Sequence, residues 1–276
     1  MNTAPLPRVY VFDLDGVLYR GADAVPFAAE TVARLRARTR PYPASLYFLT
    51  NNSSQTRADY VEKLTRLGMP CTANEVVTSS SATAAYLAAE GNVHGKTALA
   101  VGGIGIVDEL TRVGIRVVRT TEIEADTTAF DYVVVGIDRA FDYQTLLRAQ
   151  QAILRGARFV ATNRDGQFPV ENGGVLPGAG AVVAALEACT GVVPLVVGKP
   201  ETTGLQTILD AARVPATDAV MVGDRLDTDV LCGNRLGVPT VLVLTGVTTR
   251  EQAAAQIARF PERTPGAIIE TLRELP

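Results

Sequence analysis

Short apolar runs alternate with helix-like stretches along almost all of the 276 residues, and this alternation restricts the fold more than any other feature. Strands joined through helices lie parallel, so the pattern predicts an α/β protein with a doubly wound parallel sheet and helices on both faces. The predicted strands are residues 9–12, 45–49, 76–77, 97–101, 116–119, 132–135, 158–162, 195–197, 219–222 and 240–244.

Helices are expected between these strands, and several carry start or stop signals. Pro26 stands near the start of the first, and Gly68 follows the second. Thr248 and Glu251 form a predicted capping box before a later helix. The predicted helices are residues 26–38, 56–67, a stretch ending near 90, 106–113, 143–154, a stretch ending near 190, 250–259 and 267–274.

The pattern also indicates two domains. Residues 91–95 are typical of a connection, and a second series of strands and helices begins after them. We therefore predict a catalytic core formed by residues 1–91 and 194–276, with an α/β domain of residues 92–193 inserted into it. A long loop rich in Gly and Pro, from Asn163 to Gly180, belongs to the insertion, and loops of this length inside compact domains are usually functional or disordered.

Composition excludes several classes of function. The net charge is −3 and there is no basic run, so no nucleic-acid partner is expected. No apolar stretch is long enough to cross a membrane, and the first residues lack a signal-peptide pattern. The three cysteines are far apart and are interpreted as reduced core thiols. These features predict a cytoplasmic protein.

Polar residues follow four of the predicted strands, where ligands bind in doubly wound sheets. Asp13 and Asp15 follow the first strand, and Thr50, Asn51 and Asn52 follow the second. The other two ends carry Lys199 and the segment from Gly223 to Asp229, which includes Asp224. Alternate residues of an extended segment point the same way, so Asp13 and Asp15 can face one site.

The charges at these strand ends complement one another. Asp13, Asp15 and Asp224 would form an acidic cluster, and such a cluster with a phosphate suits Mg²⁺. Lys199 and the loop after Thr50 would hold the phosphate that the carboxylates repel. Only three of the 26 basic residues are lysines, which indicates that a compact ammonium is needed at Lys199.

Each of these residues also has a purely structural interpretation. Asp224 could cap a helix, Lys199 could be a solvated surface charge, and residues 50–54 could begin a helix. The segment Gly102-Gly103-Ile104-Gly105 follows a strand but has Asp108 where a dinucleotide fingerprint needs glycine, so we interpret it as a turn. His94, the only histidine, lies in the connection and is given no catalytic role.

In combination, Asp13-Leu14-Asp15-Gly16-Val17, Thr50, Lys199 and Gly223-Asp224 with Asp229 resemble the four motifs of the haloacid dehalogenase-like (HAD) superfamily of phosphohydrolases. The motifs spread over most of the chain. The long insertion between the second and third is similar to the subgroup with a large α/β cap, which is called NagD-like and includes p-nitrophenylphosphatases and phosphoglycolate phosphatases.

The resemblance implies a role for each motif. Asp13 would be the nucleophile that forms an aspartyl-phosphate, and Asp15 would be the general acid and base. Asp13, Asp224 and the backbone carbonyl of Asp15 would bind Mg²⁺. Asp229 would orient the metal's waters or Lys199, and Asp227 competes with it for this role. The residues expected to hold the phosphoryl group are Thr50, Asn51, Asn52 and Lys199.

The expected substrates are small phosphorylated metabolites, and the core motifs contact only their phosphoryl group. Substrate choice is therefore assigned to the inserted loop of residues 163–169, and Phe168 is its predicted specificity residue, unless it simply packs inside the cap. Two alternatives remain at this point. A dehalogenase would leave Asp15 and Asp224 unexplained, and an idle protein that binds a phosphometabolite would have degraded motifs. A homodimer through the cap also stays open.

Overall fold

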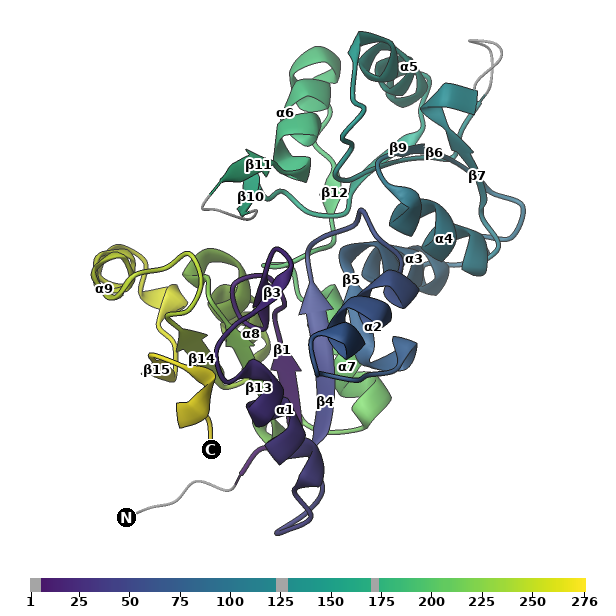
Figure 1. The fold of residues 1–276 in the computed structure, drawn as a ribbon. Helices are drawn as coiled ribbons and strands as arrows, with labels where there is room; N and C mark the ends of the chain where they lie inside the picture. Colours follow the sequence, from purple (N-terminus) through teal and green to yellow (C-terminus); the bar gives the residue numbers. More distant parts are fainter. Residues whose placement is uncertain (1–5, 123–128, 170–173) are drawn as a thin grey trace.

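The structure is a computed structural model that describes residues 6–122, 129–169 and 174–276. Two parallel sheets lie in separate halves of the molecule, and helices flank both of them (Figure 1). The predicted fold class, an α/β protein built on parallel sheets, is confirmed. No helix in these ranges has the length and apolar character needed to span a membrane.

The first sheet has six strands, and β1 lies in its interior between β4 and β13. All neighbouring strands in it are parallel, so the carboxyl ends of β1, β4 and β13 lie at one edge (Figure 1). In spatial order, the strands are β15 (Ala267–Ile269), β14 (Thr240–Val243), β13 (Ala219–Gly223), β1 (Val9–Phe12), β4 (Ser45–Thr50) and β5 (Val76–Thr78).

Both faces of β1 are buried, which explains its unbroken run of apolar residues. Tyr10 and Phe12 pack in one cluster with side chains of the first two helices, and Val9 and Val11 pack in another with side chains of three later helices. The helices are α1 (Ala28–Ala37) and α2 (Arg57–Arg66) on the first face, and α3 (Ser79–Ala89), α7 (Thr203–Ala212) and α8 (Leu231–Leu236) on the second.

The second sheet is formed by the middle of the chain and has five parallel strands. Helices α5 (Tyr143–Leu154) and α6 (Ala179–Thr190) cover one face. Helix α4 (Ile104–Arg112) covers the other and shares an apolar cluster with α3 of the first half. In spatial order the strands are β12 (Leu195–Val196), β9 (Arg158–Ala161), β8 (Tyr132–Val135), β6 (Thr97–Val101) and β7 (Arg116–Arg119).

Strand β12 differs from the expectation that residues 195–197 belong to the core. It pairs with β9 in the second sheet, so the chain crosses to the first half only after Val196. Gly198 continues this pairing, because its N–H donates to the carbonyl of Thr162 at 2.8 Å. The division into a core and a cap stays a prediction, and its second boundary lies beside this crossing.

Two further predictions are corrected near the C-terminus. The helix expected at 267–274 is wrong, because Ala267–Ile269 pairs with β14 as an edge strand and only a 3₁₀ turn follows it at Leu272–Glu274. Helix α9 (Arg250–Arg259) forms as predicted, but Thr249 rather than Thr248 is its N-cap, and Gln252 completes the capping box.

Two short hairpins lie outside the two sheets. One, β2 (Tyr19–Arg20) with β3 (Asp23–Ala24), follows the first strand. The other, β10 (Gln167–Pro169) with β11 (Val175–Pro177), lies within the segment from Asn163 to Gly180 that was predicted as a loop.

Candidate active site

A pocket of about 620 Å³ lies where the carboxyl ends of β1, β4 and β13 meet the second sheet. The first sheet supplies most of the charged side chains, and the remaining wall comes from the loops after β8 and β9, the β10–β11 hairpin, the loop after β14 and helix α9. The residues predicted to act at the site that line it are Asp13, Asp15, Thr50, Asn51, Asn52, Lys199, Asp224, Asp227 and Asp229.

Asp13 directly follows β1. Its N–H donates to the carbonyl of Val222 in β13 at 2.9 Å, which keeps its backbone in line with the sheet. Leu14 is fully buried, whereas Asp13 and Asp15 on either side of it both line the pocket, as expected for alternate residues of an extended segment. Gly16 follows at φ 83°, a backbone conformation that favours glycine, and turns the chain away.

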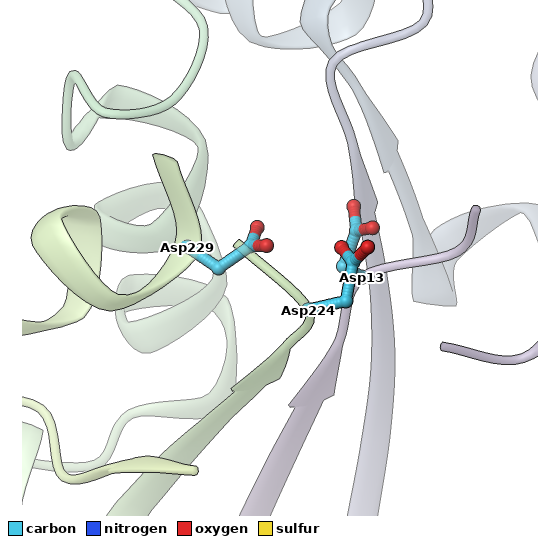
Figure 2. Close-up of side chains that lie close together, drawn as sticks. All are labelled: Asp13, Asp224 and Asp229. Atoms are coloured by element: carbon cyan, nitrogen blue, oxygen red, sulfur yellow. The ribbon is translucent and has the colours of Figure 1, made fainter. Parts of the chain in front are cut away.

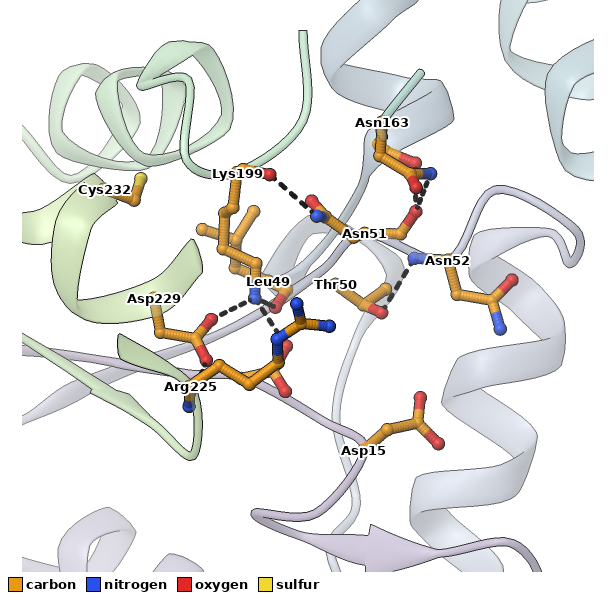
Figure 3. A network of polar contacts seen from close by, with 12 residues as sticks. Asp15, Leu49, Thr50, Asn51, Asn52, Asn163, Lys199, Arg225, Asp229 and Cys232 are labelled. Atoms are coloured by element: carbon orange, nitrogen blue, oxygen red, sulfur yellow. Dashed lines mark hydrogen bonds and ion pairs between the residues drawn. The ribbon is translucent and has the colours of Figure 1, made fainter. Parts of the chain in front are cut away.

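The ammonium group of Lys199 contacts residues of β4, the segment after β1 and the segment after β13, and Figure 3 shows its contacts with Leu49 and Asp229. Its Nζ lies 2.5 Å from Asp13 Oδ1 and 2.6 Å from Asp229 Oδ1, and it donates to the carbonyl of Leu49 at 3.1 Å. The side chain is only 4% exposed. Burial disfavours the ammonium, but the carboxylates of Asp13 and Asp229 outweigh this and hold the pKa of Lys199 well above its ordinary value.

Asp224 brings a third carboxylate to the same place (Figure 2). Carboxylate oxygens of Asp13, Asp224 and Asp229 lie within 4.8 Å of one another, and all three residues are buried. Two glycines make room for Asp224, since a Cβ on Gly16 would lie 2.6 Å from its Oδ2 and one on Gly246 would overlap the same oxygen.

This donor set fits a divalent cation. Three buried carboxylates share the one ammonium of Lys199, so negative charge is in excess. Burial and the charge of Asp229 raise the pKa of Asp224 to about 7, and burial, opposed by Lys199, leaves the pKa of Asp13 well above its ordinary value. A hard cation with oxygen ligands would relieve this repulsion.

Asp229, and not Asp227, lies against Lys199. A single π-helical turn at Leu226–Val230 carries both carboxylates, and such turns are frequent at functional sites. Asp229 Oδ2 also accepts the N–H of Arg225 at 3.1 Å, which fixes its orientation. Asp227 instead pairs with the guanidinium of Arg225 at 3.0 and 3.1 Å.

Asp15 is not one of the three clustered carboxylates, and Figure 3 shows it apart from Asp229 and Lys199. The hydroxyl of Tyr19 donates to its Oδ2 at 3.4 Å. Burial raises the pKa of Asp15 to about 6, and the charge of Lys63 opposes this shift. A carboxyl with this pKa can both carry and release a proton near neutral pH, which general acid and base catalysis requires.

The segment after β4 forms a tight turn. Thr50 Oγ1 accepts the N–H of Asn52 at 3.1 Å, and Asn52 Oδ1 in turn accepts the N–H of Ser54 at 2.9 Å. The side-chain nitrogen of Asn51 donates to the carbonyl of Lys199 at 2.9 Å, so it ties the segment after β4 to the segment after β12 (Figure 3).

Two family models match the chain and cover the part of the site that the first sheet and Lys199 supply. One is described as haloacid dehalogenase-like hydrolase and matches residues 10–116, and the other, HAD-hydrolase-like, matches residues 196–275. The chain belongs to the haloacid dehalogenase-like hydrolases. The matches contain the ends of β1, β4 and β13 as well as Lys199.

Relatives place this hydrolase in the NagD-like subgroup. An acid sugar phosphatase from Staphylococcus saprophyticus is 36% identical over 245 residues, 89% of each chain. The p-nitrophenyl phosphatase from Archaeoglobus fulgidus is 34% identical, with a TM-score of 0.85 over 98% of each chain. A Mycobacterium tuberculosis glycerol phosphate phosphatase, solved with magnesium, is 34% identical, with a TM-score of 0.84 over 98% of this chain and 76% of that one. NagD from Escherichia coli K-12 is 30% identical, with a TM-score of 0.83 over 99% of each chain.

The side chain of Phe168, the predicted specificity residue, does not belong to the part of the chain that the structure describes. The backbone of Phe168 is part of β10, and the role of its side chain stays a prediction. Its neighbours Gly166 and Gln167 do line the pocket.

Sequence reasoning gave no role at the site to Arg225 or to the loop after β14, and it treated Asn163 and Asp165 only as parts of a specificity loop. The N–H of Val247, in the loop after β14, donates to Asp224 Oδ2 at 2.8 Å. A signal for these residues existed, because they follow predicted strands just as Asp13 and Thr50 do.

Proposed function

We propose that this hydrolase cleaves phosphate monoesters of small metabolites through an aspartyl-phosphate on Asp13, with Mg²⁺ at the acidic cluster. The main support is the 2.5 Å contact of Lys199 Nζ with Asp13 Oδ1 inside a pocket that also holds Asp224. A carboxylate nucleophile, an acidic cation site and a buried ammonium are the parts that phosphoryl transfer needs, because charge spreads over the phosphoryl oxygens in its transition state.

The chemistry has two steps. In the first, a carboxylate oxygen of Asp13 attacks phosphorus, the bond to the ester oxygen breaks, and Asp15 gives its proton to the departing oxygen. In the second, Asp15 takes a proton from a water whose oxygen attacks phosphorus. The bond to Asp13 then breaks and inorganic phosphate leaves. Lys199 and the turn after Thr50 hold the phosphoryl oxygens in both steps.

The cation would be held by Asp13, Asp224 and the backbone carbonyl of Asp15, with Asp229 beside them keeping Lys199 in place. When bound, Mg²⁺ supplies positive charge that offsets both the carboxylates and the phosphoryl oxygens. The pKa values of Asp13 and Asp224 are raised first by burial and further by neighbouring carboxylates, and a bound cation would offset both effects.

The substrate class follows from the relatives and the pocket. The names of the relatives refer to sugar, glycerol and nitrophenyl phosphates, which are all small monoesters. A pocket of about 620 Å³ holds a molecule of this size. A homodimer through residues 92–193 is kept as a prediction, and sedimentation at several protein concentrations tests it.

Hydrolysis of p-nitrophenyl phosphate with Mg²⁺ tests the proposal and separates an enzyme from an idle binding protein. We expect turnover with Mg²⁺, none in excess EDTA, and recovery when Mg²⁺ is restored. Asp13→Asn keeps the shape of the side chain but removes the nucleophile, so turnover should fall at least about a thousandfold. Its circular dichroism should match the wild type, and full activity in EDTA or in this variant would overturn the mechanism.

A further inference from the structure

Asn51 is held by both halves of the molecule (Figure 3). Its backbone carbonyl accepts Asn163 Nδ2 at 2.7 Å, and its own Nδ2 donates to Asp165 Oδ2 at 3.0 Å. Asn163 and Asp165 follow β9 of the five-stranded sheet, whereas Asn51 follows β4 of the six-stranded sheet. The same Nδ2 reaches the carbonyl of Lys199 at 2.9 Å, so one amide ties together two residues proposed to hold phosphate and the second sheet.

Asp165 is itself fixed by its neighbours. Its N–H donates to Asn163 Oδ1 at 3.0 Å, and its carbonyl accepts the N–H of Gly180 at 2.9 Å, at the start of α6. Its Oδ1 lies 3.8 Å from Arg225 Nη1 while its Oδ2 accepts from Asn51. Both carboxylate oxygens therefore face residues of the first half of the molecule, and one of them binds Asn51 in the loop after Thr50.

Residues 53–55 of the loop after Thr50 also contact the second half of the molecule. Ser53 Oγ accepts the N–H of Ile137 at 3.2 Å, and Ser53 is fully buried. Gly103 and Gly105, at the start of α4, lie against the backbone of residues 53–55 so closely that a Cβ on either would overlap it. The glycine-rich segment interpreted as a turn from sequence is thus a packing surface for the loop after Thr50.

Resting on the proposed phosphatase function, we infer that Asp165 is a positioning residue for the phosphoryl site rather than a contact for the leaving group. By accepting from Asn51, it holds the loop after Thr50 and the backbone of Lys199 in the geometry that receives the phosphoryl group. This role differs from the specificity role assigned to residues 163–169, because the phosphoryl group is common to all substrates. Loss of Asp165 should therefore affect every substrate by the same factor.

Three variants separate the position of the acceptor from its charge. Asp165→Ala removes the acceptor, Asp165→Asn keeps an oxygen in place without the charge, and Asp165→Glu keeps the charge but displaces the oxygen. Glu187→Gln is the matched control, because Glu187 pairs on the exposed surface with Arg164, the residue beside Asp165. The measurements are the calorimetric affinity of the Mg²⁺-loaded protein for inorganic phosphate, kcat/KM on p-nitrophenyl phosphate and glycerol phosphate, and Tm.

We expect Asp165→Ala and Asp165→Glu to weaken phosphate binding about tenfold and to lower kcat/KM on both esters by a similar factor, since the buried amide of Asn51 loses one of its two acceptors. Asp165→Asn and Glu187→Gln should stay within about threefold of the wild type. The inference is overturned if Asp165→Asn loses as much phosphate affinity and kcat/KM as Asp165→Ala, or if kcat/KM falls unequally on the two esters. It is also overturned if the losses across the variants parallel a fall in Tm.

The phosphate titration also separates this inference from the proposed function. A wild type that binds phosphate but hydrolyses neither ester would disprove the phosphatase proposal, and the comparison of phosphate affinities would still decide the role of Asp165. A wild type that binds no phosphate would disprove both.

Discussion

The ammonium of Lys199 lies 2.5 Å from Asp13 Oδ1, although the two residues are 186 positions apart in the sequence. Lys199 follows the edge strand of the five-stranded sheet, whereas Asp13 follows an interior strand of the six-stranded sheet. The contact therefore forms only where the chain crosses between the halves of the molecule. Lys199 therefore stabilises the acidic cluster, and the cluster in turn positions Lys199, the residue proposed to hold phosphate.

Replacing Lys199 should destabilise the protein strongly. Lys199→Met leaves the buried carboxylates of Asp13 and Asp229 without their cation, and breaking a buried pair in this way costs about 3–5 kcal/mol. Urea unfolding followed by circular dichroism measures the loss. The control is Lys96→Met, because Lys96 pairs with Asp131 at the surface and should change stability little. Equal stability of the two variants would contradict the buried network.

Asp15→Asn should discriminate between leaving groups. An alkyl phosphate needs a proton on its departing oxygen, so its kcat should fall by about 10²–10⁴. p-Nitrophenolate leaves without that help, and its kcat should fall far less. Steady-state kinetics on glycerol phosphate and p-nitrophenyl phosphate give the ratio. Equal losses on both would indicate that Asp15 matters mainly for holding the metal site.

Glu109 should contribute to the stability of the contact between the two halves. It is buried on α4, and its carboxylate accepts from Arg57 of α2 at 2.6 and 3.1 Å. Glu109→Gln removes the charge and one acceptor, and the expected loss of unfolding free energy is about 1–3 kcal/mol.

The neighbouring residue on α4 provides the control for this prediction. Asp108 pairs with Arg112 within the same helix at the surface, so Asp108→Asn should leave the unfolding curve almost unchanged. If Glu109→Gln behaves like Asp108→Asn, the pair does not stabilise the contact between α2 and α4.

Phe168→Ala tests the specificity role predicted from sequence. If Phe168 closes over the leaving group, the ranking of a panel of phosphorylated metabolites should change while p-nitrophenyl phosphate turnover is mostly retained. Glu187→Gln, a change at a half-buried residue on the same half of the molecule, should leave the ranking as it is. A uniform loss on all substrates with a lower Tm would mean that Phe168 only packs.

Some elements could not be predicted because partners distant in sequence decide them. Residues 267–269 pair with β14 and include two adjacent isoleucines, which favour a strand. Together these outweigh the helical pattern predicted for residues 267–274. Helix α7 was not predicted, and Gly204 weakens its helix propensity. The structure explains that glycine, because a Cβ there would lie 2.8 Å from Leu49 Cδ1 of β4.

The sequence by itself determined the alternation of strands and helices, and with it the strand ends at which Asp13, Thr50, Lys199 and Asp224 had to lie. These features are local, since apolar period and turn residues act over a few positions. Only the tertiary structure decided which carboxylate faces Lys199 and which acceptors bind the side-chain amide of Asn51. Asp229 and Asp227 are two residues apart and chemically identical, and the π-helical turn with the neighbouring Arg225 separates their roles. The sharing of Asn51 between two sheets likewise depends on contacts more than 100 residues apart, which no local pattern encodes.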